Sequence, residues 1–228
     1  MSEAQINKTE EASGNKMLVT MVGIGAICAL LIVLSFQGTL PRIEQLKAEA
    51  LEKAVFRVVP GMETKRTFQL ENGQLKEVTG KVKDARLVYA GYDKDGKLVG
   101  LAIEASSMGF ADVIKVIYGY DPHREKVIGF YVLETKETPG LGDLIEKDPA
   151  FLANFDSLDV ALSEDKSTVK NPVVTVKNGK KKNAYEVDGI TGATISSRAI
   201  GNALNTSTNE MLPLLFKNKA LFEEKPKQ

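Results

Sequence analysis

The chain has 228 residues, enough for one sizeable domain and a further segment, and its 30 Lys and Arg balance its 30 Asp and Glu. This balance gives no sign of a nucleic-acid partner, and we interpret the densest basic cluster, residues 180–182, as a solvated hairpin tip. A single cysteine, Cys28, and a single histidine, His123, exclude an internal disulfide, a thiolate metal cluster and a histidine metal site. Because His123 lies in a turn-like stretch, we assign it no chemical role, and we predict neither a metal site nor a catalytic residue.

The N-terminal part reads as a short polar tail, residues 1–16, followed by an uncharged apolar run, residues 17–36. About 20 helical residues span roughly 30 Å, which is the thickness of the hydrocarbon core of a bilayer. The alternative is a cleaved signal peptide, but the run exceeds the usual apolar region of about 7–15 residues and no Ala-x-Ala-like site follows. We therefore predict a retained single transmembrane helix that Pro41 breaks at the membrane interface. Basic residues flank both ends of the run, so charge does not fix its orientation.

Residues 42–59 carry an apolar stripe at helical spacing, formed by Ile43, Leu46, Ala50, Leu51, Ala54, Val55 and Val58. This predicts a connecting amphipathic helix that docks on the following domain. The dipeptide Pro60–Gly61 is expected to end it. The domain itself is predicted to cover residues 60–222.

From residue 64 onward the pattern indicates β-structure. Strands at 85–92 and 97–104 flank a good hairpin turn, and strands at 112–120 and 127–133 flank the His123 turn. Further on, we predict a short helix interrupted at Pro149, two strands joined by the Lys-rich turn, a long helix disrupted at Pro213 and a frayed tail; their ranges are 143–155, 172–177, 184–188, 195–215 and 223–228. The predicted class is therefore α+β: one domain with an antiparallel sheet and flanking helices, preceded by a transmembrane helix.

The segment from Asp188 to Ser197 leads from a strand into a helix and is rich in Gly, Thr and Ser. Gly189 and Gly192 permit unusual backbone angles and a close approach of backbone N–H groups to a ligand. The free amides and the positive end of the following helix suit a phosphate group. Alternatively, Thr194 or Ser196 simply caps the helix, and the residues alone leave these two readings open.

A second segment, residues 134–143, runs from a strand into a helix and contains Pro139, Gly140 and Gly142. Leu141, between the two glycines, is poorly placed for a core contact but could lie against a planar ligand. Thr138 and the loop amides would then supply polar contacts. A purely structural turn is the alternative.

Taken together, the two segments resemble the FMN-binding domain family. The stretch Thr191, Gly192, Ala193, Thr194 resembles its flavinylation motif, in which the last Thr is esterified through the FMN phosphate, and residues 137–142 resemble its second signature. Two positions depart from the family pattern, at residues 134–135 and in the turn at residues 108–111. The resemblance implies FMN attached covalently to Thr194, with cofactor contacts from Glu137, Thr138, Gly140, Leu141, Gly142, Asp188, Thr191, Gly192, Ala193, Ser196 and Ser197.

With its single apolar span, the chain is similar to the G subunits of Rnf ion-translocating electron-transport complexes. This likeness implies a subunit that relays electrons between ferredoxin- and NAD-linked chemistry and ion transport, and that is not a complete enzyme alone. It also implies iron–sulfur and flavin subunits as neighbours, a flavin transferase that installs the FMN, and an extracytoplasmic domain on a bacterial inner membrane. The C subunit of the sodium-translocating NADH:quinone reductase is one alternative. A non-redox, membrane-tethered anion-binding or scaffold module is another.

Overall fold

The computed structural model describes residues 14–71, 73–78, 80 and 86–223. It divides into two compact units, Met1–Glu49 and Ala50–Gln228. The predicted polar tail up to residue 13, the first residue of the strand predicted at 85–92, and the tail from 224 to 228 lie outside the described residues.

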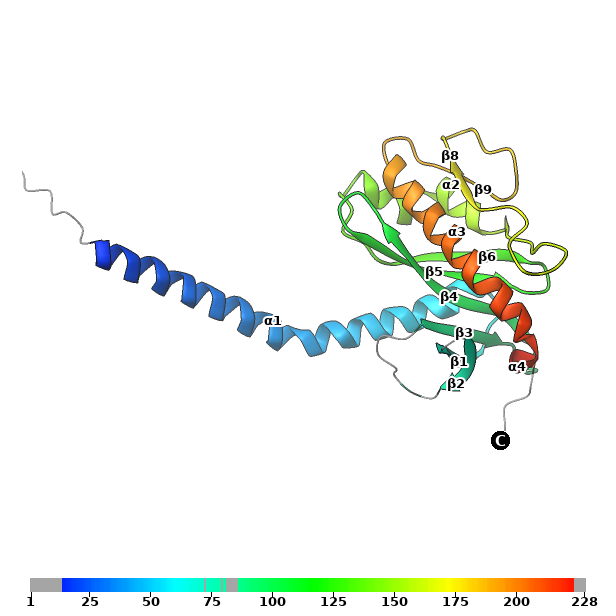
Figure 1. Ribbon diagram of the computed structural model, residues 1–228, viewed down its shortest axis with the longest axis horizontal. Helices are drawn as coiled ribbons and strands as arrows, with labels where there is room; N and C mark the ends of the chain where they lie inside the picture. The colour runs from blue at the N-terminus through cyan, green and yellow to red at the C-terminus, as the bar shows by residue number, and fades with distance from the viewer. Residues whose placement is uncertain (1–13, 72, 79, 81–85, 224–228) are drawn as a thin grey trace, which may run out of the picture. The chain divides into compact units, whose positions relative to one another are not determined.

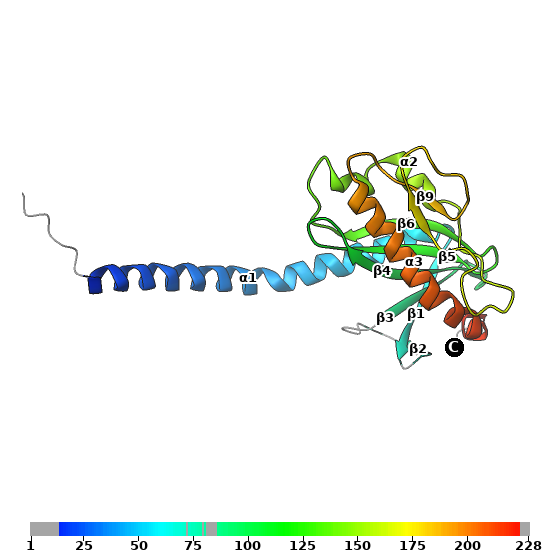
Figure 2. The ribbon, with the colours of Figure 1, turned by 45° about the horizontal axis from the view of Figure 1, so that its top comes forward.

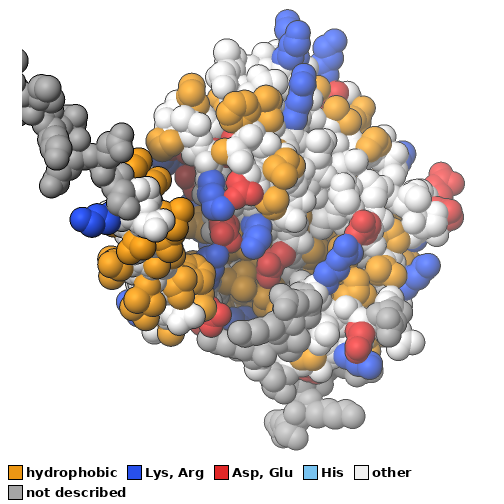
Figure 3. All heavy atoms as spheres, turned by 60° about the vertical axis from the view of Figure 1, so that its left-hand side comes forward, with side chains coloured by type: hydrophobic (Ala, Val, Ile, Leu, Met, Phe, Trp, Pro, Cys, Tyr) orange, Lys and Arg blue, Asp and Glu red, His pale blue; other side chains and the backbone are white. Residues whose placement is uncertain are grey.

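The first element is one helix, α1, Gly14–Val58, which is long and apolar enough to cross a membrane. Its apolar side chains up to Phe36 are exposed, and Figure 3 shows the hydrophobic side chains gathered on this part of the helix. The predicted break at Pro41 is wrong, because Pro41 lies inside the helix and the two predicted helices are one. A proline inside a helix removes one hydrogen bond and its ring crowds the carbonyl four residues earlier, but here the helix resumes beyond Pro41.

The compact unit is built around a seven-stranded sheet in the order β2-β1-β3-β4-β5-β6-β7, in which every neighbouring pair is antiparallel. The predicted hairpins β3–β4 and β5–β6 are confirmed, whereas the sequence pattern does not place β1, β2 and β7 individually. The strands are β1 Thr64–Glu71, β2 Gln74–Val78, β3 Arg86–Tyr92, β4 Leu98–Met108, β5 Val113–Asp121, β6 Lys126–Glu134 and β7 Leu158–Asp159. The predicted α+β class is therefore confirmed.

The two faces of the sheet are covered by different helices. Helix α3, Thr194–Lys217, lies across one face and encloses the larger core, as Figures 1 and 2 show. The last turns of α1 cover the other face, where Ala54, Val55 and Val58 are buried. Only this end of the predicted apolar stripe packs on the sheet, since Ile43 and Leu46 are exposed.

Glycines in the sheet make room for the end of α1. Gly119 of β5 pairs with Gly129 of β6, and a Cβ atom on either would lie 1.8 or 2.3 Å from the carbonyl oxygen of Val58. Such contacts are impossible for a real side chain, so these two positions must be glycine if α1 is to lie directly on the sheet.

After β6 the chain forms the 3₁₀ turn η1, Gly142–Glu146, then α2, Pro149–Leu152, and the 3₁₀ turn η2, Ala153–Phe155. The restart predicted at Pro149 is confirmed: this residue begins α2, and the Asp148 side chain caps it by accepting from the amides of Ala150 and Phe151. The predicted strands near residues 172–188 appear as β8, Val174–Val176, and β9, Glu186–Asp188. They pair in parallel, so the predicted hairpin is wrong.

Helix α3 continues through Pro213 to Lys217, so the disruption predicted there is also wrong. Leu212 and Leu215 on either side of Pro213 are buried, and their burial offsets the missing hydrogen bond. A short helix, α4, Lys219–Glu223, follows, and Phe222 packs edge-to-face on Phe68 of β1.

Candidate functional site

The start of α3 presents backbone amides that no side chain caps. The N-cap residue is Ala193, which has no side-chain acceptor, so the alternative that Thr194 or Ser196 caps the helix is wrong. Gly192, at φ +87°, supplies the left-handed turn that brings the chain from β9 into the helix. The first amides of α3 and the positive end of its dipole therefore have no side-chain cap, and a phosphate group could take that place.

Four hydroxyl groups lie around this helix start, and the structure divides them into two pairs. The buried Ser197 hydroxyl donates to the Ala193 carbonyl, 2.9 Å away, and accepts from the Ile190 amide at 3.0 Å. The buried Ser196 hydroxyl donates to the carboxylate of Glu137. Thr191 and Thr194 are exposed, and neither hydroxyl has a hydrogen-bond partner within the described part of the chain. Only these two are accessible for reaction.

A pocket of about 350 Å³ opens directly beside Thr194. Its walls come from β8 and the loop after it, from the loop that precedes α3, and from the first turns of α3. Three cationic residues, Lys177, Lys180 and Arg198, line it together with Thr191 and Thr194. Cations, the uncapped start of α3 and free hydroxyls make this pocket suitable for an anionic phosphate ester.

Lys180 was missed in the sequence because residues 180–182 resembled a hairpin tip, and no sequence pattern pointed to Lys177 or Arg198. In the structure the carboxylate of Asp188 accepts from the amides of Gly179 and Lys180, at 2.9 and 3.3 Å, and thereby shapes the turn after β8. The Lys181 ammonium donates to the side-chain oxygen of the buried Asn154, which also accepts from the Asp188 amide. Asp188 thus organises the pocket wall through these contacts.

The second predicted loop, residues 137–142, lies next to the start of α3. Gly140 has φ +77°, and its amide donates to the Asp143 carboxylate at 2.7 Å. An ion pair with Lys147 holds the pKa of the Asp143 carboxyl below its usual range, so this acceptor stays charged. Thr138 and Leu141 are left exposed at the loop surface, and Leu141 is 54 % exposed. Leu141 is therefore free to contact a ligand.

The two predicted loops pack closely against each other at Gly142. A Cβ atom there would lie 2.5 Å from a carboxylate oxygen of Glu137 and 2.9 Å from the Ser196 hydroxyl. The glycine is required by this close packing and not by its backbone angles. The structure thus brings the two sequence motifs together, although they are separated by about 50 residues.

A third segment, the turn at residues 108–111, also reaches this site. The amides of Phe110 and Ala111 donate to the other oxygen of Glu137, at 2.9 and 3.0 Å. The Phe110 side chain is 69 % exposed. In the sequence this turn stood out only as a departure from a family pattern, because no local signal links it to Glu137.

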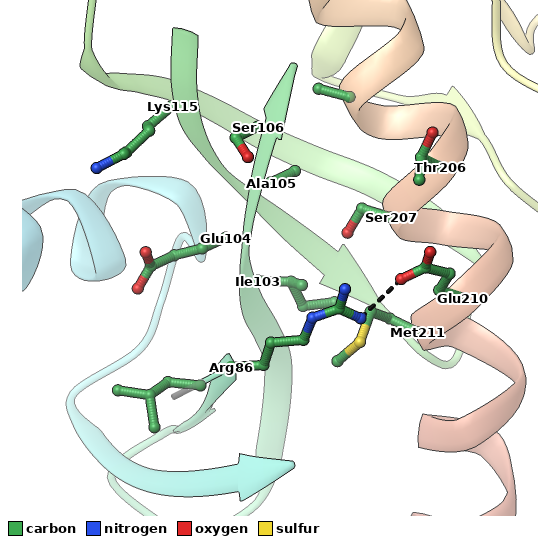
Figure 4. A pocket seen from close by; sticks show the side chains of 12 residues that line it. Arg86, Ile103, Glu104, Ala105, Ser106, Lys115, Thr206, Ser207, Glu210 and Met211 are labelled. Carbon is green, nitrogen blue, oxygen red and sulfur yellow. Dashed lines mark hydrogen bonds and ion pairs between the residues drawn. The ribbon is translucent and has the colours of Figure 1, made fainter. Parts of the chain in front are cut away.

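A separate hollow of about 450 Å³ lies between the middle of α3 and strands β3 and β4, shown close up in Figure 4. An ion pair between Arg86 and Glu210, 2.7 Å long, bridges β3 and α3 there. No residue of the two predicted loops lines this hollow. Among the described residues, no cluster of three or more His, Cys, Asp or Glu side chains could hold a metal ion.

The fold and the site together define an FMN-binding domain tethered to an apolar helix, and the FMN-binding domain family matches residues 109–209. The solved structures with the same fold include NqrC of Shewanella oneidensis, at 17 % identity and a TM-score of 0.61 over 77 % of this chain and 99 % of that one. The C subunit of the Na⁺-translocating NADH-quinone reductase from Parabacteroides distasonis is similar at 22 % identity and a TM-score of 0.57, over 82 % and 98 % of the two chains.

The sequence relatives are more specific. The G subunit of the ion-translocating oxidoreductase complex of Methanosarcina acetivorans is 32 % identical over 85 % of this chain and 92 % of the relative. The protein of the same name from Shewanella piezotolerans is 29 % identical over 82 % and 85 %. The G subunit of the proton-translocating ferredoxin:NAD(+) oxidoreductase complex of Clostridium ljungdahlii is 26 % identical over 69 % and 80 %. The chain belongs to the family of G subunits of ion-translocating oxidoreductase complexes, and with its apolar helix it is a membrane-associated protein.

Proposed function

We propose that this protein is an electron-transfer subunit of a membrane complex that links ferredoxin and NAD redox chemistry to ion translocation, and that its FMN is esterified to Thr194. The observation that carries the proposal is the accessible Thr194 hydroxyl at an uncapped helix start, beside a cation-lined pocket. The FMN-binding domain match over residues 109–209 and the relatives among the G subunits support the cofactor and the complex.

Attachment requires an activated flavin. Condensing free FMN with an alcohol in water would have to release water, so the donor must carry FMN as a phosphoanhydride. In the proposed step the Thr194 oxygen forms a bond to the flavin phosphorus and loses its proton, while the phosphoanhydride bond breaks and a nucleoside monophosphate leaves. A flavin transferase would catalyse this step. The amides of α3 and the side chains of Lys177, Lys180 and Arg198 would neutralise the phosphate.

Bound FMN supplies one- and two-electron redox chemistry that no side chain of the protein offers. The exposed Leu141 and the polar Thr138 would contact the cofactor from the second loop, as the sequence predicted. Covalent attachment would keep the flavin in place in every redox state, so the site need not bind all of them equally well. The protein would then relay electrons between neighbouring iron–sulfur and flavin subunits.

We further propose that α1 spans the inner membrane once and that the compact unit lies on the extracytoplasmic side. The apolar stretch up to Phe36 supports the span, because its exposed hydrophobic surface would be covered by lipid. The side of the membrane follows only from the resemblance to the family.

A second candidate is the C subunit of a sodium-translocating NADH:quinone reductase, and the shared fold with NqrC favours it. That likeness concerns the fold, whereas the sequence relatives are G subunits of ion-translocating oxidoreductase complexes. Proteins that co-purify with this one from its native membrane distinguish the two complexes.

The proposal is tested by producing the full-length protein with and without a flavin transferase and recording its intact mass. We expect a gain of one FMN less one water, and flavin fluorescence that stays with the denatured protein on a gel. Thr194→Val should abolish both signals, whereas the matched control Thr191→Val should keep them. A wild-type protein that gains no mass would instead support a non-redox anion-binding or scaffold module.

A further inference from the structure

The carboxylate of Glu137 is buried at the point where three segments meet. Its side chain follows β6, and the residue is only 6 % exposed. One oxygen accepts from the amides of Phe110 and Ala111 in the β4–β5 turn, at 2.9 and 3.0 Å. The other accepts the hydroxyl proton of Ser196 on the first turn of α3. A single side chain thus links both predicted loops with a third.

Neutral groups alone hold this carboxylate, because no ion pair of the described residues includes Glu137. Burying a carboxylate is costly unless hydrogen bonds compensate, and three donors do so here. Its backbone is fixed as well, since the Glu137 amide donates to the Thr135 hydroxyl at 3.1 Å. The arrangement therefore keeps the Glu137 side chain in one defined place.

The enclosure leaves little room for a ligand at Glu137. A Cβ atom on Gly109 would lie 2.5 Å from one carboxylate oxygen, and a Cβ atom on Gly142 would lie 2.5 Å from the other. Two glycines from different loops therefore close around the carboxylate. Its surroundings are protein on both sides, which argues against a direct contact with the cofactor.

We propose that Glu137 is a positioning residue that fixes the first turn of α3 against the two loops, and so presents the Thr194 hydroxyl in the geometry that flavin transfer needs. This inference rests on the proposed function. Ser196, whose hydroxyl donates to Glu137, lies two positions after Thr194. Phe110 and Leu141, both exposed, are adjacent in sequence to the two enclosing glycines, so the same contacts also set the loop surfaces around the cofactor.

Substitution of Glu137 by glutamine tests whether the hydrogen bonds of this side chain matter or its charge. The side-chain oxygen of Gln can accept from the Phe110 and Ala111 amides, while its NH₂ group can donate to the Ser196 hydroxyl, which accepts equally well. Glu137→Gln should thus keep all three links without the charge, whereas Glu137→Ala removes them all. Ser196→Ala removes only the link to α3. The matched control is Ser207→Ala, which loses a buried hydroxyl on the same helix, bonded to Tyr118 at 2.9 Å but outside the site.

The test measures the rate of FMN incorporation into each full-length protein by intact mass, with a flavin transferase and a flavin dinucleotide as the donor. We expect Ser196→Ala and Glu137→Ala to lower the transferase's kcat for this protein about tenfold or more, with KM little changed, because misplacing a reacting group by about 1 Å can cost up to about a hundredfold in rate. Glu137→Gln and Ser207→Ala should stay within about twofold of the wild type. Unfolding midpoints of the unloaded proteins identify any variant that fails to fold.

Wild-type rates in Ser196→Ala and in a folded Glu137→Ala would overturn the inference. Glu137→Gln as slow as Glu137→Ala would also overturn it, because the charge would then matter and not the position. If Glu137→Ala does not fold, the comparison of FMN incorporation rates between Ser196→Ala and Ser207→Ala decides by itself: equal rates would overturn the inference. A wild-type protein that incorporates no FMN contradicts the proposed function itself, whereas any contrast among the variants presupposes that the wild type is loaded.

Discussion

At the scale of single residues, burial distinguishes the hydroxyl groups that have a structural role from those that are accessible for reaction. Thr191, Thr194, Ser196 and Ser197 all carry hydroxyls within seven residues of sequence, yet the two serines are buried and hydrogen-bonded while the two threonines are exposed. Because both serines are almost fully buried, their hydroxyls are shielded from a flavin donor, whereas the threonine hydroxyls are open to one. Within this Gly-rich motif, only the hydroxyls of Thr191 and Thr194 are therefore candidates for flavin attachment. Thr194 is the one at the first residue of α3.

Asp121, at the end of β5, gives a pH prediction. Burial alone would raise the pKa of its carboxyl, but hydrogen bonds from the Arg124 side chain and from the Arg124 and His123 amides outweigh burial and lower it below the ordinary value of 3.8. A lowered folded-state pKa means that the unfolded chain binds the proton more tightly. The stabilisation is therefore present above about pH 4 and is lost as the pH falls through the folded-state pKa.

We expect Asp121→Asn to lower the free energy of unfolding by about 1–2 kcal/mol at pH 7, with a smaller difference at pH 3. Urea unfolding midpoints of both proteins at the two pH values check this. An effect of equal size at both pH values would show that the carboxyl charge does not contribute.

At the scale of secondary-structure elements, the sequence predicted the local turns correctly but did not predict how strands β8 and β9 pair. The hairpins β3–β4 and β5–β6 were predictable because their turns are local, and Pro149 was a reliable sign of a helix restart. Pro41 and Pro213 were misleading because each helix continues beyond its proline. The parallel pairing of β8 with β9 was missed because strands close in sequence usually form hairpins.

The candidate site likewise has parts that the sequence predicts and parts that only the tertiary fold brings together. Its two loops were found from their glycines and threonines, which mark special backbone turns. The link between Glu137 and Ser196 joins residues 59 positions apart, and the cations Lys177, Lys180 and Arg198 face Thr194 only through the tertiary fold. Neither has a sequence pattern of its own.

The packing of α1 on the sheet gives a prediction for an element. A methyl group at Gly119 would collide with the Val58 carbonyl, so α1 would have to move away from β5 and β6. We expect Gly119→Ala to destabilise the compact unit by about 1–3 kcal/mol, measured by urea unfolding of the detergent-solubilised protein. Gly38→Ala, which has open space around its Cβ position, serves as the control. Equal midpoints for the two variants would contradict the close packing.

At the scale of the whole molecule, a folded FMN-binding domain follows an apolar helical stretch, up to Phe36, whose large hydrophobic side chains are exposed. Lipid would cover these side chains, and the helix would hold the compact unit at the membrane where other members of a complex can exchange electrons with it. Because the chain has one cysteine, Cys28, its topology can be mapped with introduced thiols.

In a Cys28→Ser background, we expect Lys182→Cys to react with a membrane-impermeant maleimide added to intact cells, because Lys182 is an exposed residue of the compact unit. Asn15→Cys, which precedes the apolar stretch, should react only after the cells are opened. The opposite labelling pattern would place the compact unit in the cytoplasm.

The central claim is that FMN is esterified to Thr194, and the most direct measurement is fragmentation of the tryptic peptide that carries it. Trypsin cleaves after Lys182 and Arg198, so residues 183–198 form one peptide that contains Thr191, Thr194, Ser196 and Ser197. The account predicts that every fragment of the loaded peptide that includes Thr194 carries the FMN mass, and that fragments ending before it do not. FMN on Thr191 or on either serine, or an unmodified peptide from a transferase-treated protein, would contradict it.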